Sequence, residues 1–460
     1  DGELRWIGST LTDFPVDAEG TSIEQPAWLD QRIRVTGIVR PDPAVALTTQ
    51  WDLLTGQLAG ATWAIPGEID AQRRYEHGAL ALSGVRPRKA SIGGTTRGWQ
   101  LEAGLVTSNW GLGMVANDGA TDPLFGRADF GDRVVRVRAT HLPAELRATG
   151  RGVFVSAAAD WVVDDDTASL RDDQLAFQGV FSALAVDRDR KLGTYFTARQ
   201  QWEADRSRVT QAGVLDGYAT APLSVGEGEL ELSAEAAAIL GRTSRSTTYG
   251  ARDFVGVESL GATGVATWKP AEPPLELTLR AGFASGDGNP DDAITHDFAF
   301  DRDFGVGMVL FDQVTGAVEA AAFQLLSDPT YAGQPPDGVD AIVTEGAFRR
   351  AAFVSPVARW APRPFEARAG IVASFATGPF AEPFYSYRAG GTPYNQHDLP
   401  AEGRLLGTEL DWALAWDSPS DHTLRAGVEL EGGHLLLGAP LRGAGPNVVH
   451  LVTATGRVQW

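Results

Sequence analysis

The strongest constraint on this chain is a two-residue period in its apolar side chains. In the stretch PPLELTLRAGFASGDGNPDD, an apolar residue stands at every second position from Leu275 to Phe283. The polar residues Glu276, Thr278 and Arg280 stand between them. A period of two separates the two faces of a β-strand, whereas a helix would spread these residues around its surface. The stretch therefore predicts a strand with one apolar and one polar face.

The same alternation recurs along the chain and predicts an all-β fold with eighteen strands. The predicted spans are residues 3–10, 32–40, 44–54, 78–86, 98–107, 133–141, 151–162, 173–186, 192–204, 207–220, 228–240, 256–269, 275–285, 346–361, 365–376, 404–416, 422–433 and 448–460. Short turns containing Gly, Pro or Asp alternate with long polar loops. The long loops are predicted at residues 55–77, 108–132, 163–172, 241–254, 286–345, 377–402 and 434–447.

An even strand number with this alternation of connections is typical of a transmembrane antiparallel up-and-down β-barrel, with short periplasmic turns and long extracellular loops. The prediction is therefore one outer-membrane barrel domain over residues 1–460, in a Gram-negative bacterium. Its apolar faces would meet lipid and its polar faces a lumen. Closure would leave no unpaired strand edge in the hydrocarbon.

A soluble β-sandwich is the alternative, because it would bury the apolar faces instead. Long strands, small residues on the polar faces, and aromatic residues near strand ends favour the barrel. The residues placed like an interfacial girdle are Trp51, Trp161, Trp202, Trp268, Trp360, Phe365 and Trp416. The terminal Trp460 closes an alternating strand and resembles the assembly signal of outer-membrane barrels.

Composition excludes several classes of function. Lys+Arg 39 against Asp+Glu 59 gives a net charge of -20, which disfavours a nucleic-acid partner. The absence of cysteine excludes disulfides and thiol catalysis. Among the histidines only His397, beside Asp398, suggests catalysis, and no nucleophile motif accompanies it. The protein is therefore predicted not to be an enzyme and to need no cofactor.

Charged residues on the predicted inner faces are of both signs. The lumen-lining candidates are Arg32, Arg34, Glu102, Arg136, Arg138, Arg199, Glu231, Glu276, Arg280, Arg368, Glu409 and Arg425. These side chains could create a transverse field that orients polar solutes at a constriction. They could equally pair across strands and hold the wall together. Either way they predict a wet, polar interior.

The longest predicted loop, 286–345, combines an acidic start with a strongly apolar middle. Its apolar side chains are expected to pack, either into the pore as a constriction or against neighbouring loops. The constriction candidates are Asp287, Asp291, Asp292, Asp301 and Asp303, whose charge would favour cations or neutral sugars over anions. Asp287, Asn289 and Asp291 have the spacing of the first half of a calcium loop. The later ligands are not at the required offsets, so no metal is predicted.

The eighteen strands, the chain length, and RAGFASGDGNPDD leading into a large loop with FAFDRDFG resemble the alginate-export family of outer-membrane porins. The resemblance implies passage of a polysaccharide or another polar solute through an Arg-lined lumen gated by loops. The mixed inward charge and the acidic chain argue against an anionic polymer.

The predicted function is a passive channel for polar solutes or saccharide chains, surrounded by outer-membrane lipid and lipopolysaccharide. The alternative is a structural or assembly subunit with a blocked lumen, bound to partner proteins of an envelope complex.

Overall fold

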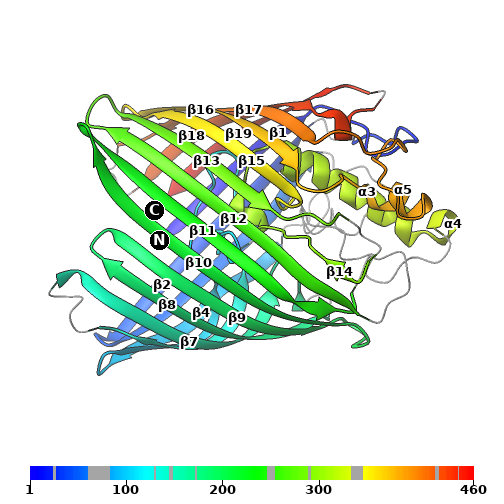
Figure 1. Ribbon diagram of the computed structural model, residues 1–460. Helices are drawn as coiled ribbons and strands as arrows, with labels where there is room; N and C mark the ends of the chain where they lie inside the picture. The colour runs from blue at the N-terminus through cyan, green and yellow to red at the C-terminus, as the bar shows by residue number, and fades with distance from the viewer. Residues whose placement is uncertain are drawn as a thin grey trace.

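The computed structural model describes residues 1–23, 27–60, 83–128, 131–143, 149–170, 173–245, 254–288, 292–332, 346–419, 424–443 and 445–460. Eighteen long strands form the barrel seen in Figure 1. They are β1 (Gly2–Leu11), β2 (Trp28–Asp42), β3 (Val45–Gly60), β4 (Ser83–Thr96), β5 (Trp99–Thr107), β6 (Arg133–His141), β7 (Arg151–Asp164), β8 (Leu175–Asp187), β9 (Arg190–Trp202), β10 (Val209–Val225), β11 (Gly228–Thr243), β12 (Val255–Pro270), β13 (Leu275–Ala284), β15 (Ala351–Trp360), β16 (Phe365–Ala376), β17 (Leu405–Asp417), β18 (Arg425–Leu437) and β19 (Val448–Gln459).

The barrel is closed and antiparallel. Each long strand pairs with its neighbours in sequence, and β1 pairs with β19 to complete the ring, with Gly8 opposite Ala454. A further strand of two residues, β14 (Ile294–Thr295), pairs in parallel with β12 above the end of β13. The predicted eighteen-stranded antiparallel barrel is confirmed. Closure satisfies the backbone groups that an open sheet would expose to lipid.

The two-residue period separates the two faces of the wall. On β13, Leu277 and Leu279 are 41% and 50% exposed, whereas Thr278 and Arg280 are 7% exposed. Exposed Leu, Val, Ile, Phe and Trp side chains continue this belt around the other strands. Without water to drive burial, such a belt is stable facing hydrocarbon. The apolar faces therefore point outward and the polar faces inward.

The two ends of the barrel differ in their connections. At one end, adjacent strands are joined by turns as short as Arg188–Asp189 and Gly226–Glu227, and the two chain ends pair through Gly2 N and Trp460 O at 2.8 Å. The connections at the other end contain the helices η2 (Arg302–Phe304), η3 (Leu310–Thr315), α3 (Gly316–Ser327), α4 (Pro329–Ala332), α5 (Pro383–Arg388) and η5 (Ala439–Leu441). Figure 1 shows α3, α4 and α5 gathered at this long-loop end. None of the helices in the described ranges is long and apolar enough to cross a bilayer.

One predicted strand was misplaced. The expected strand at 78–86 lies at 83–96 instead, joined to β5 by a tight turn at Arg97 and Gly98; residues 78–82 are outside the described part of the chain. Pro87 and the pair Gly93–Gly94 interrupt the apolar alternation, so the sequence pattern did not reveal the true bounds of this strand. Pro87 lies at a register shift against β3, where a residue without an N–H is tolerated.

Candidate functional site

The loop from 108 to 132 begins its course through the barrel at the wall formed by β9, β10 and β11. Trp110 Nε1 donates to Asp216 Oδ1 at 2.8 Å, and the indole stacks on Tyr195 with ring centroids 5.5 Å apart. The backbone N–H of Leu112 donates to the carboxylate of Glu235. Gly111 has φ 57, and a Cβ there would collide with Glu235, so this close approach requires glycine.

The same loop then reaches the opposite wall. Arg5 Nη1 on β1 donates to Asp122 Oδ2 at 2.6 Å, and Arg32 Nη1 on β2 donates to Ala128 O at 3.0 Å. Gly126 N donates to Glu431 Oε1 on β18 at 3.2 Å. Because β10 lies half-way round the ring from β1, the loop crosses the lumen. A barrel of this size is about 35 Å across, given a strand spacing of about 4.8 Å and a tilt of about 40°.

A second insertion, from 296 to 318, packs against the first. Asp301 N donates to Met114 O at 2.8 Å, and Asn117 N donates to Asp301 Oδ2 at 3.0 Å. Gly131 N donates to Asp303 Oδ2 at 2.5 Å. These bonds join segments separated by more than 170 positions in sequence. The two insertions therefore form one internal structure.

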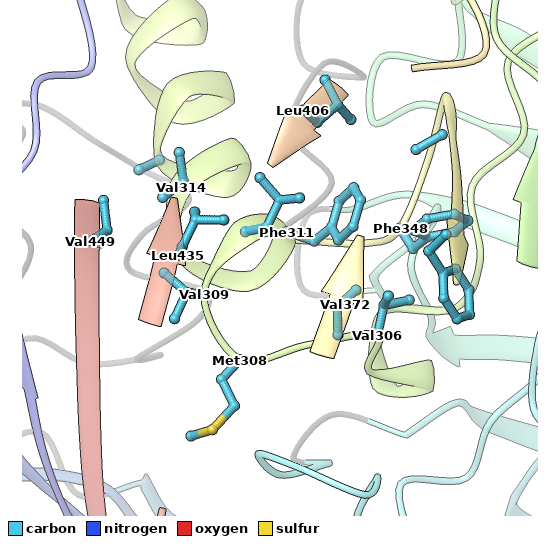
Figure 2. Packing of buried hydrophobic residues seen from close by; sticks show 14 of the residues in the cluster. Val306, Met308, Val309, Phe311, Val314, Phe348, Val372, Leu406, Leu435 and Val449 are labelled. Carbon is cyan, nitrogen blue, oxygen red and sulfur yellow. The ribbon is translucent and has the colours of Figure 1, made fainter. Parts of the chain in front are cut away.

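The apolar part of the second insertion lies in the core that Figure 2 shows. Eight apolar side chains in the apolar middle of the predicted loop 286–345 are buried: Phe298, Phe300, Phe304, Val306, Met308, Val309, Leu310 and Phe311. They contact inner-face residues of the barrel such as Val372, Leu435 and Val449. Burying them recovers about 25 cal/mol for each Å² of apolar area, which holds the insertion inside.

Glu409 on β17 anchors this insertion to the wall. Its carboxylate accepts three backbone N–H groups: Met308 N at 2.6 Å, Val309 N at 2.7 Å and Leu310 N at 2.9 Å. These groups precede and begin the helical segment η3–α3, whose first N–H groups have no partner within the helix. A carboxylate at this end also complements the helix dipole. Glu409 is 1% exposed, so its carboxylate is enclosed by the protein and serves the insertion.

A cavity of about 100 Å³ remains between the two insertions and the wall formed by β18, β19 and β1. Along β19 its lining extends from Leu451 to Arg457, a rise of about 20 Å at 3.3 Å per residue. The inner side is formed by residues of the two insertions, including Asp122 and Met308. The cavity therefore follows the wall from near the long-loop end towards the short-turn end.

Charges of both signs line this cavity. The charged lining residues are Arg5, Arg127, Arg302, Arg457, Asp122, Asp312, Glu429 and Glu431. Several are paired: Arg457 with Asp417 at 2.6 Å, Arg127 with Asp30 at 2.9 Å, and Arg302 with Asp166 at 3.0 Å. The cavity is thus polar along much of its wall.

Most of the predicted lumen residues lie on the inner face and have partners there. Arg34 pairs with Asp52, Arg136 with Asp160 and Arg138 with Glu102, each at 2.7 Å. The others are placed as follows: Arg32 on Ala128 O, Arg199 on Asp165 at 2.5 Å, Glu276 near Lys269 at 3.5 Å, Arg280 on Gly305 O at 2.8 Å, Arg368 on Glu429, and Glu409 on the η3 amides. Glu231 and Arg425 are exposed near the short-turn end. Cross-strand pairing thus engages many of these charges.

Four of the five acidic loop candidates are described, and they lie in two places. Asp301 and Asp303 are buried between the insertions, whereas Asp287 and Asp292 are partly exposed at the rim, around the turn that leads from β13 to β14. Asp291 and Asn289 lie outside the described residues, so the calcium spacing is described only at Asp287, whose backbone N donates to Asp297 Oδ1 at 2.8 Å. Only part of the predicted acidic set is therefore brought together.

Burial raises the pKa of carboxyl groups where the two insertions meet loop 165–174. Burial raises the pKa of Asp166 to about 7, against the opposing effect of Arg302. Burial and the neighbouring Asp166 and Asp132 raise the pKa of Asp301 well above its usual range. For Asp165, Arg199 outweighs burial and lowers the pKa. Acidic groups here therefore carry less negative charge at neutral pH than their number suggests.

The crossing by loop 108–132 was not predicted from sequence. Its anchors Trp110, Asp216 and Glu235 stand in segments read only as a loop and two strands. The length of the connection was one sequence signal that it has a structure of its own, because a loop this long within a compact domain is usually functional or structured. The glycine-rich stretch SNWGLGMVANDG marks the place where the loop backbone approaches the wall.

No known family model matches the chain, and no curated protein matches it. Several solved structures do match the chain. OccK5 (OpdH) of Pseudomonas aeruginosa is 10% identical, with 100% of this chain and 98% of that chain covered and a TM-score of 0.53. OccAB1 of Acinetobacter baumannii is 9% identical, with 99% and 95% covered and a TM-score of 0.54. OccK8 (OprE) of Pseudomonas aeruginosa is 9% identical, with 100% and 98% covered and a TM-score of 0.53.

The chain has the fold of an outer-membrane porin. The likeness covers the barrel from end to end, and at these identities it concerns the fold. The resemblance to the alginate-export family is not supported, because the similar structures are of a different group of channels. Together with the apolar outer belt, the eighteen-stranded barrel places the protein in the outer membrane of a Gram-negative bacterium.

Proposed function

We propose that the protein is a passive channel for small polar solutes. The observation that carries this proposal is the charged cavity that follows the β18–β19–β1 wall inside a closed barrel. Side chains of both signs replace part of the hydration of a polar solute without trapping it by one strong charge. We assign the interior no catalytic role and no cofactor.

The size of the cavity favours small solutes over saccharide chains. A volume of about 100 Å³ is below the range of about 300–1,000 Å³ that is usual for sites enclosing drug-sized molecules. A polysaccharide would pass only if the two insertions moved away from the wall. We therefore propose that the insertions set the size limit, and that residues 286–345 act as pore-lining structure together with loop 108–132.

The narrowness of the cavity also supports a second candidate, a structural or assembly subunit with a blocked lumen. Conductance distinguishes the two functions. We expect the purified protein to open steps of small conductance in planar bilayers, and a variant with residues 296–345 replaced by a short Gly-Ser linker to open larger steps. A linker replacement within the rim segment 286–295 is the matched control, because it shortens the same loop without removing the core residues. Absence of steps from the native protein and the deletion variant alike would favour the structural candidate.

A further inference from the structure

Two histidines face each other on the outer surface of the barrel. His434 on β18 is directly opposite His450 on β19, and their Nδ1 atoms are 2.8 Å apart. Both residues share the outward phase of Leu436 and Val448, which are exposed. His450 is itself exposed, and it is the third residue of β19, which begins at the long-loop end. The pair therefore lies at the long-loop edge of the apolar belt.

The barrel wall fixes the positions of the two imidazoles. Their rings stand edge to face, with centroids 4.9 Å apart, on strands that are hydrogen-bonded to each other. His450 N donates to Thr12 Oγ1 at 2.9 Å, which ties the start of β19 to the end of β1. A Cβ at Gly432 would overlap the indole of Trp412, so this glycine leaves room for the indole beside His434. The distance between the two nitrogens is therefore determined by paired strands and not by a loop.

The spacing of the nitrogens discriminates between the metals that imidazole can bind. Neutral imidazole is a ligand for Zn²⁺, Cu²⁺ and Ni²⁺, with a metal–nitrogen distance of about 2.0 Å. Neighbouring nitrogens are then about 2.8 Å apart in a square-planar site and about 3.3 Å apart in the tetrahedral site that zinc prefers. The observed 2.8 Å between the two Nδ1 atoms matches the square-planar site. Of the two metals that accept this geometry, copper binds more tightly.

We propose that His434 and His450 form a surface site for a divalent copper ion. The two Nδ1 atoms would occupy neighbouring corners of the square, each ring turning until its lone pair points roughly 45° away from the line between the nitrogens. In the described part of the chain, no group of three or more His, Asp or Glu side chains could hold a metal ion. Water would therefore fill the other corners. The site lies outside the barrel and is independent of channel activity.

Trp412 on β17 opposes copper binding at this site. Its Nε1 donates to His434 Nε2 at 3.1 Å. An indole N–H can only donate, so in the metal-free pair the proton of His434 is on Nδ1 and is shared with Nδ1 of His450. Copper takes both Nδ1 atoms, so that proton moves to Nε2 of His434, where it faces the indole N–H. No proton is lost from the pair, but the hydrogen bond from Trp412 is broken.

The test titrates the full chain, in detergent and without a histidine tag, with Cu²⁺ and separately with Zn²⁺. Calorimetry gives the affinity, and electron paramagnetic resonance gives the number of nitrogen ligands on copper. We expect one copper ion held by two nitrogens, and zinc bound at least about tenfold more weakly. His434→Gln and His450→Gln should each weaken copper binding about a hundredfold, because even a residue that only supports a ligand typically contributes 10–100-fold. Trp412→Phe removes the competing donor and should tighten binding about two- to tenfold.

The matched control is His141→Gln. His141 is another exposed histidine beside a tryptophan, with its ring centroid 5.2 Å from that of Trp99, but it lies at the short-turn end and should leave copper binding unchanged. Copper binding that survives in the double variant His434→Gln with His450→Gln would overturn the proposal. Zinc bound as tightly as copper would overturn the square-planar assignment, and weaker binding by Trp412→Phe would show that copper uses other ring nitrogens. Conductance of the same samples separates these failures from failure of the channel function.

Discussion

The anchoring of the second insertion by Glu409 allows a sharp test of what narrows the barrel. Glu409→Ala removes a buried carboxylate that accepts three backbone N–H groups, at 2.6, 2.7 and 2.9 Å. The substitution also leaves Met308 N, Val309 N and Leu310 N without an acceptor in an apolar setting. Apolar packing around Val309 and Leu435 remains. The variant should therefore keep its barrel and loosen its insertion.

The magnitude follows from the bonds lost. A hydrogen bond to a charged group contributes about 1.5–3 kcal/mol, so three that share one carboxylate contribute on the order of 5 kcal/mol. At about 1.4 kcal/mol for each factor of ten, the ratio of released to held insertion rises more than about a thousandfold. Glu409→Gln keeps one oxygen acceptor and should lie between the native protein and Glu409→Ala.

Single-channel recording measures this change directly. We expect the native protein to show one small conductance, Glu409→Ala to alternate between that level and a larger one, and Glu409→Gln to visit the larger level less often. Glu276→Ala is the control, because Glu276 is an inner-face carboxylate near Lys269 and Arg359 that bonds to neither insertion. Steps identical in the native and Glu409→Ala channels, with the variant folded, would refute the view that this insertion limits the pore. Larger steps in Glu276→Ala as well would show a general loosening of the wall.

Three further outcomes are expected. Glu429→Gln with Glu431→Gln should move the reversal potential in a salt gradient towards anion preference, because four arginines then line the cavity against two carboxylates; an unchanged potential would exclude this cavity as the pathway. Trp110→Ala should weaken the far anchor of loop 108–132 by about 3 kcal/mol, seen as faster hydrogen exchange there with the melting temperature of the barrel unchanged. Burial raises the pKa of Glu382 from 4.5 to about 8. The stability that this residue gives α5 is therefore complete below pH 4.5 and is lost as the pH rises through 8. Hydrogen exchange of residues 377–404 should become faster at high pH in the native protein and not in Glu382→Gln.

How far the sequence predicts this protein differs between wall and interior. The strand number, the outward leucines of β13 and the inward Arg280 follow from a period of two, which is a local property of the backbone. The strand at 83–96 was not recognised in the sequence because Pro87 and two glycines break that period. In the structure it is stabilised by pairing with β3 and β5.

The sequence predicted which types of side chain fill the interior, but it did not predict their contacts. The apolar content around Phe298 to Phe311 required burial, and the inner-face position of Glu409 followed from alternation. That Glu409 would hold the N-terminal amides of η3 depends on segments about 100 positions apart, which no local pattern encodes. The same is true of Asp301, which accepts a hydrogen bond from Asn117 N where the two insertions meet.

By itself the sequence determined a closed barrel with lipid outside and charge inside, because alternation, strand number and turn chemistry act over a few residues. Only the tertiary structure decided what fills the barrel. Ring closure brings β1 beside β19 and places β10 opposite them, so the anchors Glu235 and Arg5 of loop 108–132 stand on opposite walls only in the closed ring. Contacts of that kind depend on the curvature of the whole sheet, and this is why the pathway along the wall is a property of the folded molecule.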